Sequence, residues 1–149
     1  MAKLGYGIEN LNAWQKALEL AVFINKELVP RLPKEERYAL VDQLRRSAQS
    51  IPANIAEGYG RYYYQDNIRF CYIARGSLEE THSHLVLARK MGYFPVELLD
   101  KVDGDIAIIR KLINGYITYL KTEKPGCNEP GSTVREGMPP YIVSGDTEE

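Results

Sequence analysis

Cysteine, tryptophan and long uncharged hydrophobic runs are all scarce in this sequence of 149 residues. Its two cysteines, Cys71 and Cys127, lie in very different sequence contexts, which argues against a disulfide framework or a cysteine metal site. A reducing, cytoplasmic setting is therefore expected. No uncharged run is long enough to span a membrane, and the N-terminus lacks the apolar core of a signal peptide. We therefore expect no membrane association.

The motifs that usually accompany catalysis are also missing. The sequence has no glycine-rich phosphate loop, no nucleophile elbow and no HExxH motif. Its one metal-like pattern, Glu79-x-x-His82, occurs once, whereas di-metal helical bundles use two such motifs and two further carboxylates. We expect no enzymatic activity, and no metal, cofactor or small-molecule substrate.

Strong charge of either sign is absent, since the formal net charge is −1. The charges are nevertheless unevenly distributed. Residues 1–122 carry 17 basic and 14 acidic residues, a net charge of +3, whereas residues 123–149 carry 2 and 6, a net charge of −4. This basic excess is far smaller than that of a dedicated nucleic-acid binder, so charge alone leaves the partner open.

Helical periodicity runs through most of the chain and predicts four helices. The first covers residues 11–28, with an Asn12–Gln15 capping box and an end at Pro30 and Pro33. The second begins near Lys34 and closes at Gly58 and Gly60, where glycine would adopt the left-handed conformation. The third runs from about 66 to 91 and ends at Gly92. The apolar stripes are expected at Leu11, Trp14, Leu18, Ala21, Val22 and Leu28, then at Leu40, Val41, Leu44, Ala48, Ile51 and Ile55, and then at Phe70, Ile73, Ala74, Leu78, Thr81, Leu85 and Ala88.

The fourth predicted helix has the most regular pattern. Leu99, Val102, Ile106, Ile109, Ile113, Tyr116 and Leu120 repeat as a heptad seam. Because short loops join the helices, residues 1–122 are expected to form an all-α, up-down-up-down antiparallel four-helix bundle. Residues 123–149 are rich in proline and glycine and acidic, and are expected to be disordered or loosely docked through Tyr141–Val143.

Pro52 lies inside the second helical pattern, in the segment QLRRSAQSIPANIAEG of residues 43–58. Since apolar spacing continues past it, we expect one kinked helix, the alternative being a break with Ser50 as a new N-cap. A polar stripe follows this helix and consists of Gln43, Ser47, Ser50, Asn54 and Glu57. It is interpreted as a helix or subunit interface, with small polar groups meeting the displaced backbone. A ligand-binding or RNA-contacting face is the alternative.

Further apolar residues fall opposite the expected core stripes. On the first helix Leu20 and Phe23 lie opposite the expected core stripe. On the third helix the residues in this position are Tyr72, Val86 and Leu87. Ile108 is the example on the fourth. Apolar residues on the outer side of three helices predict a second buried surface and hence a homo-oligomer, with Leu20, Phe23 and Tyr72 at the interface.

Two clusters could contact nucleic acid. Arg45 and Arg46 could bind phosphate, although an i,i+4 ion pair between Arg46 and Asp42 would explain Arg46 equally well. The further cations that could help are Arg37, Arg61, Arg69, Arg75, Arg89 and Lys90. The turn GRYYYQ, residues 60–65, places arginine beside Tyr62, Tyr63 and Tyr64, which could stack on bases. The alternative is that these tyrosines cover the end of the bundle or an interface.

Several of these segments together resemble the 23S rRNA intervening-sequence proteins. They are LNAWQKA (11–17), ERYAL (36–40), QLRRSAQSIPANIAEG (43–58) and ARGSL (74–78), and the resemblance covers about residues 8–121. It implies a four-helix bundle that assembles into a ring-like pentamer. It also implies a relationship to the accessory variability determinant of diversity-generating retroelements, a basic pentamer that partners a reverse transcriptase and nucleic acid. The acidic tail and Thr81-His82 depart from the family pattern.

The resulting expectation is a homopentameric bundle that binds structured RNA or DNA, or a ribonucleoprotein partner. Arg45, Arg46, Arg61 and Arg69 would contact phosphate. The alternative is an oligomeric adaptor for another protein, including a retroelement reverse transcriptase.

Overall fold

The computed structural model describes residues 7–122, and this part of the chain is helical with no strand. The long helices are α1 (Asn12–Phe23), α2 (Leu40–Tyr59), α3 (Tyr64–Lys90) and α4 (Val96–Thr122). Short helical turns are η1 (Ile8–Asn10), η2 (Ile24–Leu28), η3 (Val29–Arg31) and η4 (Lys34–Glu36). The predicted all-α fold is confirmed. The predictions for the tail, residues 123–149, lie outside the described residues.

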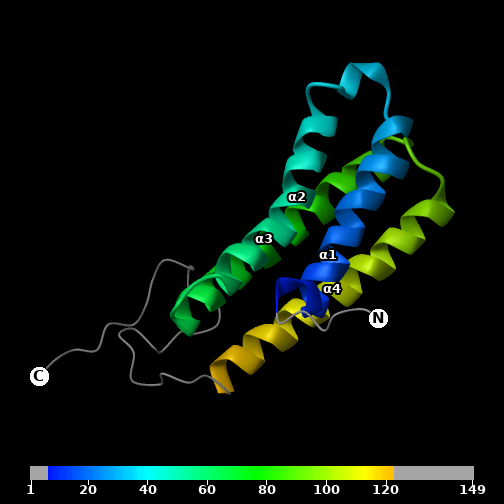
Figure 1. Ribbon diagram of the computed structural model, residues 1–149. Helices are drawn as coiled ribbons and strands as arrows, with labels where there is room; N and C mark the ends of the chain where they lie inside the picture. The colour runs from blue at the N-terminus through cyan, green and yellow to red at the C-terminus, as the bar shows by residue number, and fades with distance from the viewer. Residues whose placement is uncertain (1–6, 123–149) are drawn as a thin grey trace, which may run out of the picture.

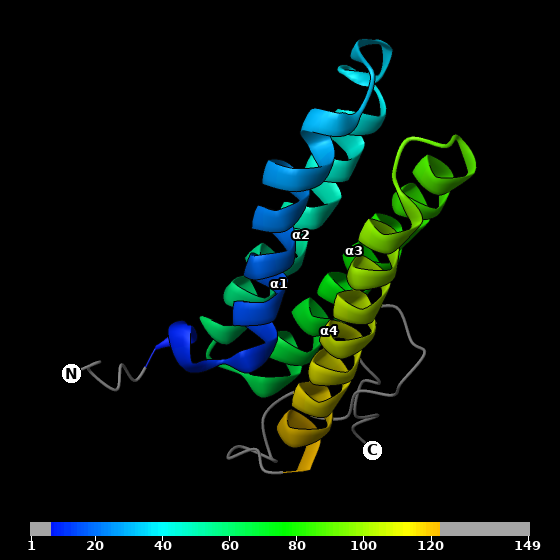
Figure 2. The same ribbon diagram turned by 90° about the vertical axis from the view of Figure 1, so that its right-hand side faces the viewer.

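The four helices pack around one core. Helix α2 packs on α1 and α3, and α4 packs on α3 and α1. In Figures 1 and 2 the chain turns back at each connection, so helices that are consecutive in sequence run side by side in opposite directions. The α1–α2 connection lies at one end of the bundle, and the α2–α3 turn and the end of α4 lie at the other (Figure 1). No helix within residues 7–122 combines the length and apolar character needed to cross a membrane.

The core face of α1 differs from the predicted one. Its buried residues include Ala13, Ala17 and Leu20, whereas Leu18 and Val22 are 39% and 46% exposed. The prediction that Leu20 faces away from the core is therefore wrong, since only 2% of it is exposed. Small alanines allow α1 to approach its neighbours closely, and this packing outweighs the larger side chains on the other stripe.

The start of α1 also differs from the prediction. Leu11 occupies the N-cap position without a side-chain cap, and Asn12 is already helical. The Gln15 amide donates to the backbone carbonyl of Glu9 in the preceding turn η1. The predicted capping box between Asn12 and Gln15 is therefore replaced by a hydrogen bond between α1 and η1.

Helix α2 begins at Leu40 rather than near Lys34, because the chain first forms the separate turn η4. The Glu36 carboxylate accepts the backbone N–H of Leu40 at 3.2 Å and the Tyr93 hydroxyl at 3.0 Å. These two bonds hold the first turn of α2 against the α3–α4 connection. Burial is the largest cause that raises the pKa of Tyr93. The hydrogen bond that its hydroxyl donates to Glu36 raises this pKa further.

Glycines end α2 and α3 in different ways. Gly92 has φ +75° and follows α3, where the N–H of Gly92 bonds Arg89 and that of Tyr93 bonds Ala88, which is a Schellman motif. Gly60, in contrast, has φ −78°, so the expected left-handed end of α2 does not form there. Gly58 serves a different purpose: a Cβ atom there would meet Asn67 and Phe70 of α3 within 3 Å.

Pro52 is buried inside one uninterrupted helix, so Ser50 does not start a new one. Two residues of the polar stripe, Ser47 and Ser50, bond side chains of α3, and Asn54 bonds Ser50 within α2. Ser47 Oγ is 3.0 Å from Thr81 Oγ1, Ser50 Oγ is 2.8 Å from Ser77 Oγ, and Asn54 donates to the Ser50 carbonyl at 2.8 Å. These small side chains form a hydrogen-bonded seam between two helices of the same chain. The other two residues of the stripe, Gln43 and Glu57, are exposed.

Two other residues placed at the expected subunit interface contact the rest of the chain. Tyr72 is only 7% exposed, so the prediction that it faces outward is wrong. Its ring lies under the Arg75 guanidinium at 4.9 Å and the Lys121 ammonium at 5.7 Å, because long basic side chains can cover an aromatic face. Phe23 is half-buried, with Lys101 Nζ of α4 3.9 Å from its ring centroid.

Candidate nucleic-acid interface

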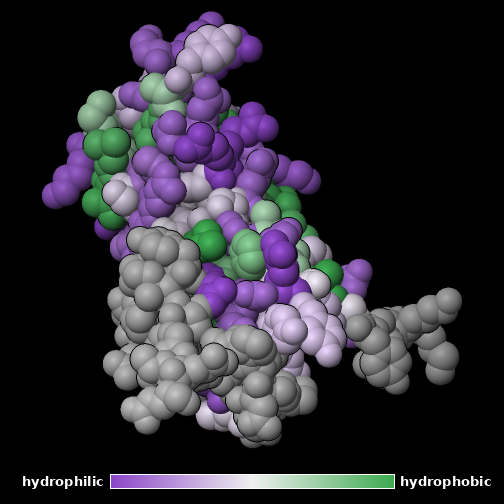
Figure 3. All heavy atoms as spheres, turned by 90° about the vertical axis from the view of Figure 1, so that its left-hand side faces the viewer, coloured by the Kyte–Doolittle hydropathy of each residue, from purple (hydrophilic) through white to green (hydrophobic). Residues whose placement is uncertain are grey.

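A basic hollow of about 460 Å³ lies where the α1–α2 connection meets the first turns of α2. Figure 3 shows that hydrophilic residues cover this end of the molecule, at the top of the view. Its lining combines apolar side chains with three cations and one carboxylate. Its lining residues are Val29, Leu32, Pro33, Lys34, Arg37, Tyr38, Val41, Asp42 and Arg45. We call this site the basic hollow.

Local structure brings the three cations together. Lys34 belongs to η4, which follows the extended residue Pro33, and Arg37 directly follows that turn. Val41 and Arg45 are four residues apart in α2 and therefore lie on one side of that helix. Tyr38, in the turn just before α2, lines the same hollow. The Arg37 guanidinium lies 5.3 Å from the centroid of the Tyr38 ring, which is 81% exposed. The lining of the basic hollow therefore combines cations with an exposed aromatic ring.

Arg45 and Arg46 are both exposed, but only Arg45 lines the hollow. Within residues 7–122 the side chain of neither residue makes a hydrogen bond or an ion pair, and the ion pair considered between Arg46 and Asp42 does not form. Asp42 instead lines the basic hollow beside Arg45. A phosphate could bind Arg45 without first displacing an internal carboxylate.

The other two predicted arginines lie at the opposite end of α2, a helix about 30 Å long. Arg61 is paired with Glu57 at 2.8 Å, and Arg69 with Asp66 at 2.9 Å. The structure therefore does not join Arg61 and Arg69 with Arg45 in one patch. Their positive charges are also partly neutralised by these neighbouring carboxylates.

The three predicted tyrosines separate into two environments. Tyr64 and Arg61 line a second hollow, of about 510 Å³, at the end of the bundle formed by the α2–α3 turn and the end of α4. Tyr62 and Tyr63 lie outside it and contact each other edge to face, with ring centroids 4.9 Å apart. Tyr62 is 88% exposed, so it does not cover the end of the bundle.

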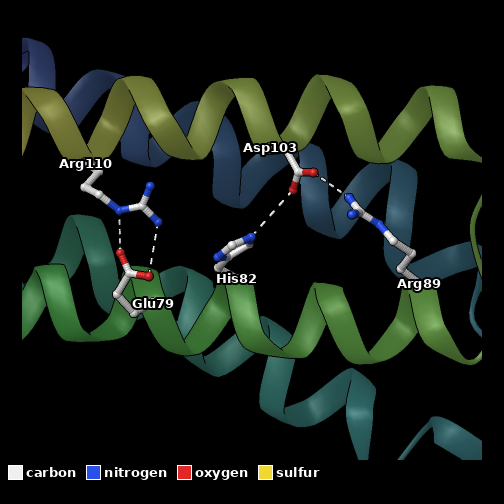
Figure 4. Close-up of polar contacts among 5 residues, drawn as sticks. All are labelled: Glu79, His82, Arg89, Asp103 and Arg110. Atoms are coloured by element: carbon white, nitrogen blue, oxygen red, sulfur yellow. Dashed lines mark hydrogen bonds and ion pairs between the residues drawn. The ribbon is translucent and has the colours of Figure 1, made fainter.

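A row of polar contacts, including two arginine–carboxylate ion pairs, joins α3 and α4 and explains the Glu79-x-x-His82 pattern (Figure 4). Glu79 receives a two-pronged contact from Arg110, with Nη2 to Oε2 at 3.1 Å. His82 points toward Asp103, with Nε2 to Oδ1 at 3.7 Å, and Asp103 also pairs with Arg89. The hydrogen bond from Arg110 is the main reason that the pKa of Glu79 is lowered. Across residues 7–122 no three histidine, cysteine or acidic side chains gather as a metal site would require.

Sequence reasoning missed several residues of both hollows. Lys34 and Tyr38 were not singled out, although Lys34-x-x-Arg37-Tyr38 follows a proline that ends one helix and precedes the next. The heptad pattern predicts Tyr116 in the core seam and does not mark Tyr119, but both line the second hollow. Their i,i+3 spacing near the end of the fourth helical pattern was the available signal.

The chain is similar to known proteins in both sequence and fold. Residues 9–115 match the family described as 23S rRNA-intervening sequence protein. The crystal structure of a protein with unknown function from the S23 ribosomal protein family of Bacteroides thetaiotaomicron has 31% sequence identity and a TM-score of 0.65. That match covers 70% of this chain and 97% of the other. A comparison with curated proteins found no match. The chain therefore belongs to the 23S rRNA-intervening sequence protein family.

Proposed function

We propose that this protein is a non-enzymatic, cytoplasmic homopentamer that binds structured RNA through the basic hollow. The observation that carries the proposal is the convergence of Lys34, Arg37 and Arg45 on one concave surface. A phosphate backbone is recognised chiefly by such cations, and the exposed Tyr38 ring adds a stacking surface. Arg45 and Arg37 supply most of the phosphate contacts, and Arg46 contributes at the margin.

Repetition around a ring would compensate for the small charge of each hollow. Three cations facing one carboxylate form a weak site for one phosphate group. Five copies held in fixed positions bind one RNA with much higher avidity than a single copy, provided that the RNA can reach several sites at once. The proposed assembly and the proposed ligand therefore support each other.

Exposed apolar residues support the assembly. Leu18 and Val22 of α1 are 39% and 46% exposed, and Ile108 of α4 is 51% exposed. Light scattering should give the mass of five chains, and Leu18→Glu with Val22→Glu should shift it to smaller species. An unchanged mass in this double variant would remove α1 from the interface, and a monomeric wild type would overturn the pentamer.

RNA binding is tested by fluorescence anisotropy with a fluorescently labelled, fully paired RNA hairpin titrated at several salt concentrations. We expect Arg37→Ala/Arg45→Ala to weaken binding and to lower the slope of log K against log salt by about two units, since each phosphate contact contributes about one. Arg46→Ala should have a smaller effect than Arg45→Ala.

The matched control is Lys16→Ala/Lys111→Ala, which also removes two exposed positive charges but outside the basic hollow. If both double variants weaken binding equally, the effect comes from overall charge and the hollow is not the site. No binding by the wild type at physiological salt would contradict the RNA proposal itself.

One observation favours a second candidate, an oligomeric adaptor for another protein, including a retroelement reverse transcriptase. An apolar hollow of about 360 Å³ on α1 is lined by Leu18, Val22 and Phe23 together with charged neighbours. If the pentamer forms while Leu18 and Val22 remain accessible to amide hydrogen exchange and chemical labelling, this surface is available to a protein partner. Burial of both residues in the pentamer would exclude them from that role.

A further inference from the structure

The second hollow is built largely from tyrosines that are distant in sequence. Tyr59 ends α2, Tyr64 begins α3, and Tyr116 and Tyr119 lie in the last two turns of α4. Asn10 of η1 and Arg61 of the α2–α3 turn also line it. A concave site of a few hundred Å³ with aromatic walls and a few polar groups is the usual form of a small-ligand site. We call this site the tyrosine hollow.

Two of the rings already form the start of a stack. Tyr116 and Tyr119 have ring centroids 6.3 Å apart and planes inclined by only 12°. Tyr119 is 52% exposed, so a planar ligand can reach it. The Tyr116 hydroxyl accepts a hydrogen bond of 2.9 Å from Asn67, a buried residue of α3, which holds the ring in place. The stacking surface is therefore oriented before any ligand arrives.

The tyrosine hollow also has a cation in position to bind an anion. The Arg61 guanidinium lies 4.9 Å from the centroid of the Phe70 ring and 2.8 Å from the Glu57 carboxylate. Both side chains of the Glu57–Arg61 pair are about half exposed, and such surface pairs add little stability. Arg61 can therefore exchange the carboxylate for a phosphate at small cost, while Phe70 keeps its guanidinium beside the hollow.

We propose that the tyrosine hollow binds one nucleoside monophosphate unit, with the base stacked on Tyr119 and the phosphate paired with Arg61. Burial raises the pKa of Tyr116 to about 12, so its hydroxyl remains protonated and can donate to the base or ribose. The same unit can come from an unpaired nucleotide of RNA or from a free nucleotide. In its RNA form the inference rests on the proposed function and adds recognition of unpaired bases to it.

Calorimetric titration of the full chain with AMP, and with ribose 5-phosphate as the ligand lacking a base, tests the site. AMP should bind more tightly than ribose 5-phosphate. Tyr119→Ala should weaken AMP binding about 5- to 150-fold, the range expected for one stacked base, and Arg61→Ala should weaken both ligands. Tyr62→Ala is the matched control, because Tyr62 is an exposed tyrosine outside the tyrosine hollow.

The source of the nucleotide is separated by two labelled hairpins, one fully paired and one with a single bulged adenosine. Tighter binding of the bulged hairpin, lost in Tyr119→Ala, identifies an unpaired RNA nucleotide as the ligand. Tyr119-dependent AMP binding without any preference for the bulge identifies the free nucleotide.

Failure of this inference and failure of the proposed function give different results. If the wild type does not bind AMP, or if AMP binding is unaffected by Tyr119→Ala, the tyrosine hollow is not a nucleotide site, whatever the paired hairpin does. If AMP binds as expected while the paired hairpin does not bind, the proposed RNA function fails and the nucleotide site stands. Helix content measured by circular dichroism confirms that Tyr119→Ala is folded.

Discussion

A Cβ atom on Gly58 would lie only 2.8 Å from Oδ1 of Asn67, and 2.9 Å from the Asn67 backbone oxygen. The two residues face each other where α2 crosses α3, close to the turn that joins these helices. Asn67 is buried, and its amide also orients Tyr116. Glycine at position 58 therefore permits the close approach of two helices and indirectly supports one wall of the tyrosine hollow.

Gly58→Ala should lower the free energy of unfolding by about 1–3 kcal/mol, although alanine is the better helix former, because the added methyl group meets the Asn67 backbone oxygen and the Phe70 Cβ atom of α3. Gly76→Ala is the control, since a Cβ atom there has no neighbour within 4 Å. It should raise stability by up to about 1 kcal/mol. Urea unfolding at one protein concentration measures both. Equal effects of the two changes would refute the close-contact explanation.

The hydroxyl pair Ser47–Thr81 should stabilise the α2–α3 seam. Thr81 is fully buried, and Thr81→Val keeps its shape but removes its contacts with Ser47 and the Ser77 carbonyl. We expect a loss of about 1–3 kcal/mol, because the Ser47 hydroxyl is left buried with one partner fewer. In the double variant with Ser47→Ala the loss should be smaller than the sum of the two single losses. Strict additivity would show that the two hydroxyls do not interact.

The kink at Pro52 stays a prediction. Proline in a helix interior costs about 3 kcal/mol relative to alanine and removes one backbone hydrogen bond, so it is expected to bend α2. Pro52→Ala should straighten α2 and change the oligomer size, which a crystal structure of the variant and light scattering would show. Unchanged helix direction together with unchanged oligomer mass would refute the idea that Pro52 shapes the helix for close packing.

The Glu79–Arg110 pair predicts a modest loss of stability in acid. The pKa of Glu79 is lowered in the folded state, so its contribution is present above the ordinary value of 4.5 and is lost as the pH falls through the lower folded value. Because both side chains are substantially exposed, we expect no more than about 1 kcal/mol. Urea unfolding between pH 6 and pH 3 should show a smaller acid loss for Glu79→Gln than for the wild type. Glu80→Gln, which changes the adjacent carboxylate, is the control.

Cys71 should be chemically silent in the folded protein. Burial raises the pKa of its thiol to about 12, and no part of the side chain is exposed. In a Cys127→Ser background, which leaves one cysteine, a thiol reagent at pH 8 should react only after denaturant is added, because the thiolate is the reactive form. Rapid reaction of the native protein would mean that α3 opens at Cys71 more readily than its packing indicates.

The sequence correctly predicted structural features that depend only on residues close together in the chain. The heptad spacing of α4 predicted six of its buried residues between Leu99 and Leu120, but near the end of the helix Ile117 is buried in place of the predicted Tyr116. Gly92 marked the end of α3 through its left-handed conformation. In contrast, α2 was predicted to begin at Lys34, because periodicity could not show that Glu36 bonds both Leu40 and Tyr93. Tyr93 is distant in sequence, so this contact could not be seen before the fold was known.

The candidate sites depended on tertiary structure more strongly than the helices did. Arg45 and Arg46 are adjacent in the sequence, yet only Arg45 lines the basic hollow with Lys34 and Arg37. The turn containing Tyr62, Tyr63 and Tyr64 was noticed as a motif, but Tyr64 is the member that joins the tyrosine hollow. The two hollows lie at opposite ends of α2. Arg45 therefore lies far from Arg61 and Arg69, although the sequence pattern had grouped them in one predicted phosphate-binding set.

The sequence by itself determined that the chain is helical, because the spacing of apolar residues depends only on the helical repeat. It did not determine which stripe of α1 faces inward, since the exposed Leu18 is as apolar as the buried Leu20. That choice followed from packing, because Ala13 and Ala17 let the helix approach its neighbours on one side only. Helix formation depends on residues near in sequence, whereas burial of a helix face depends on how well it packs against residues that are distant in sequence.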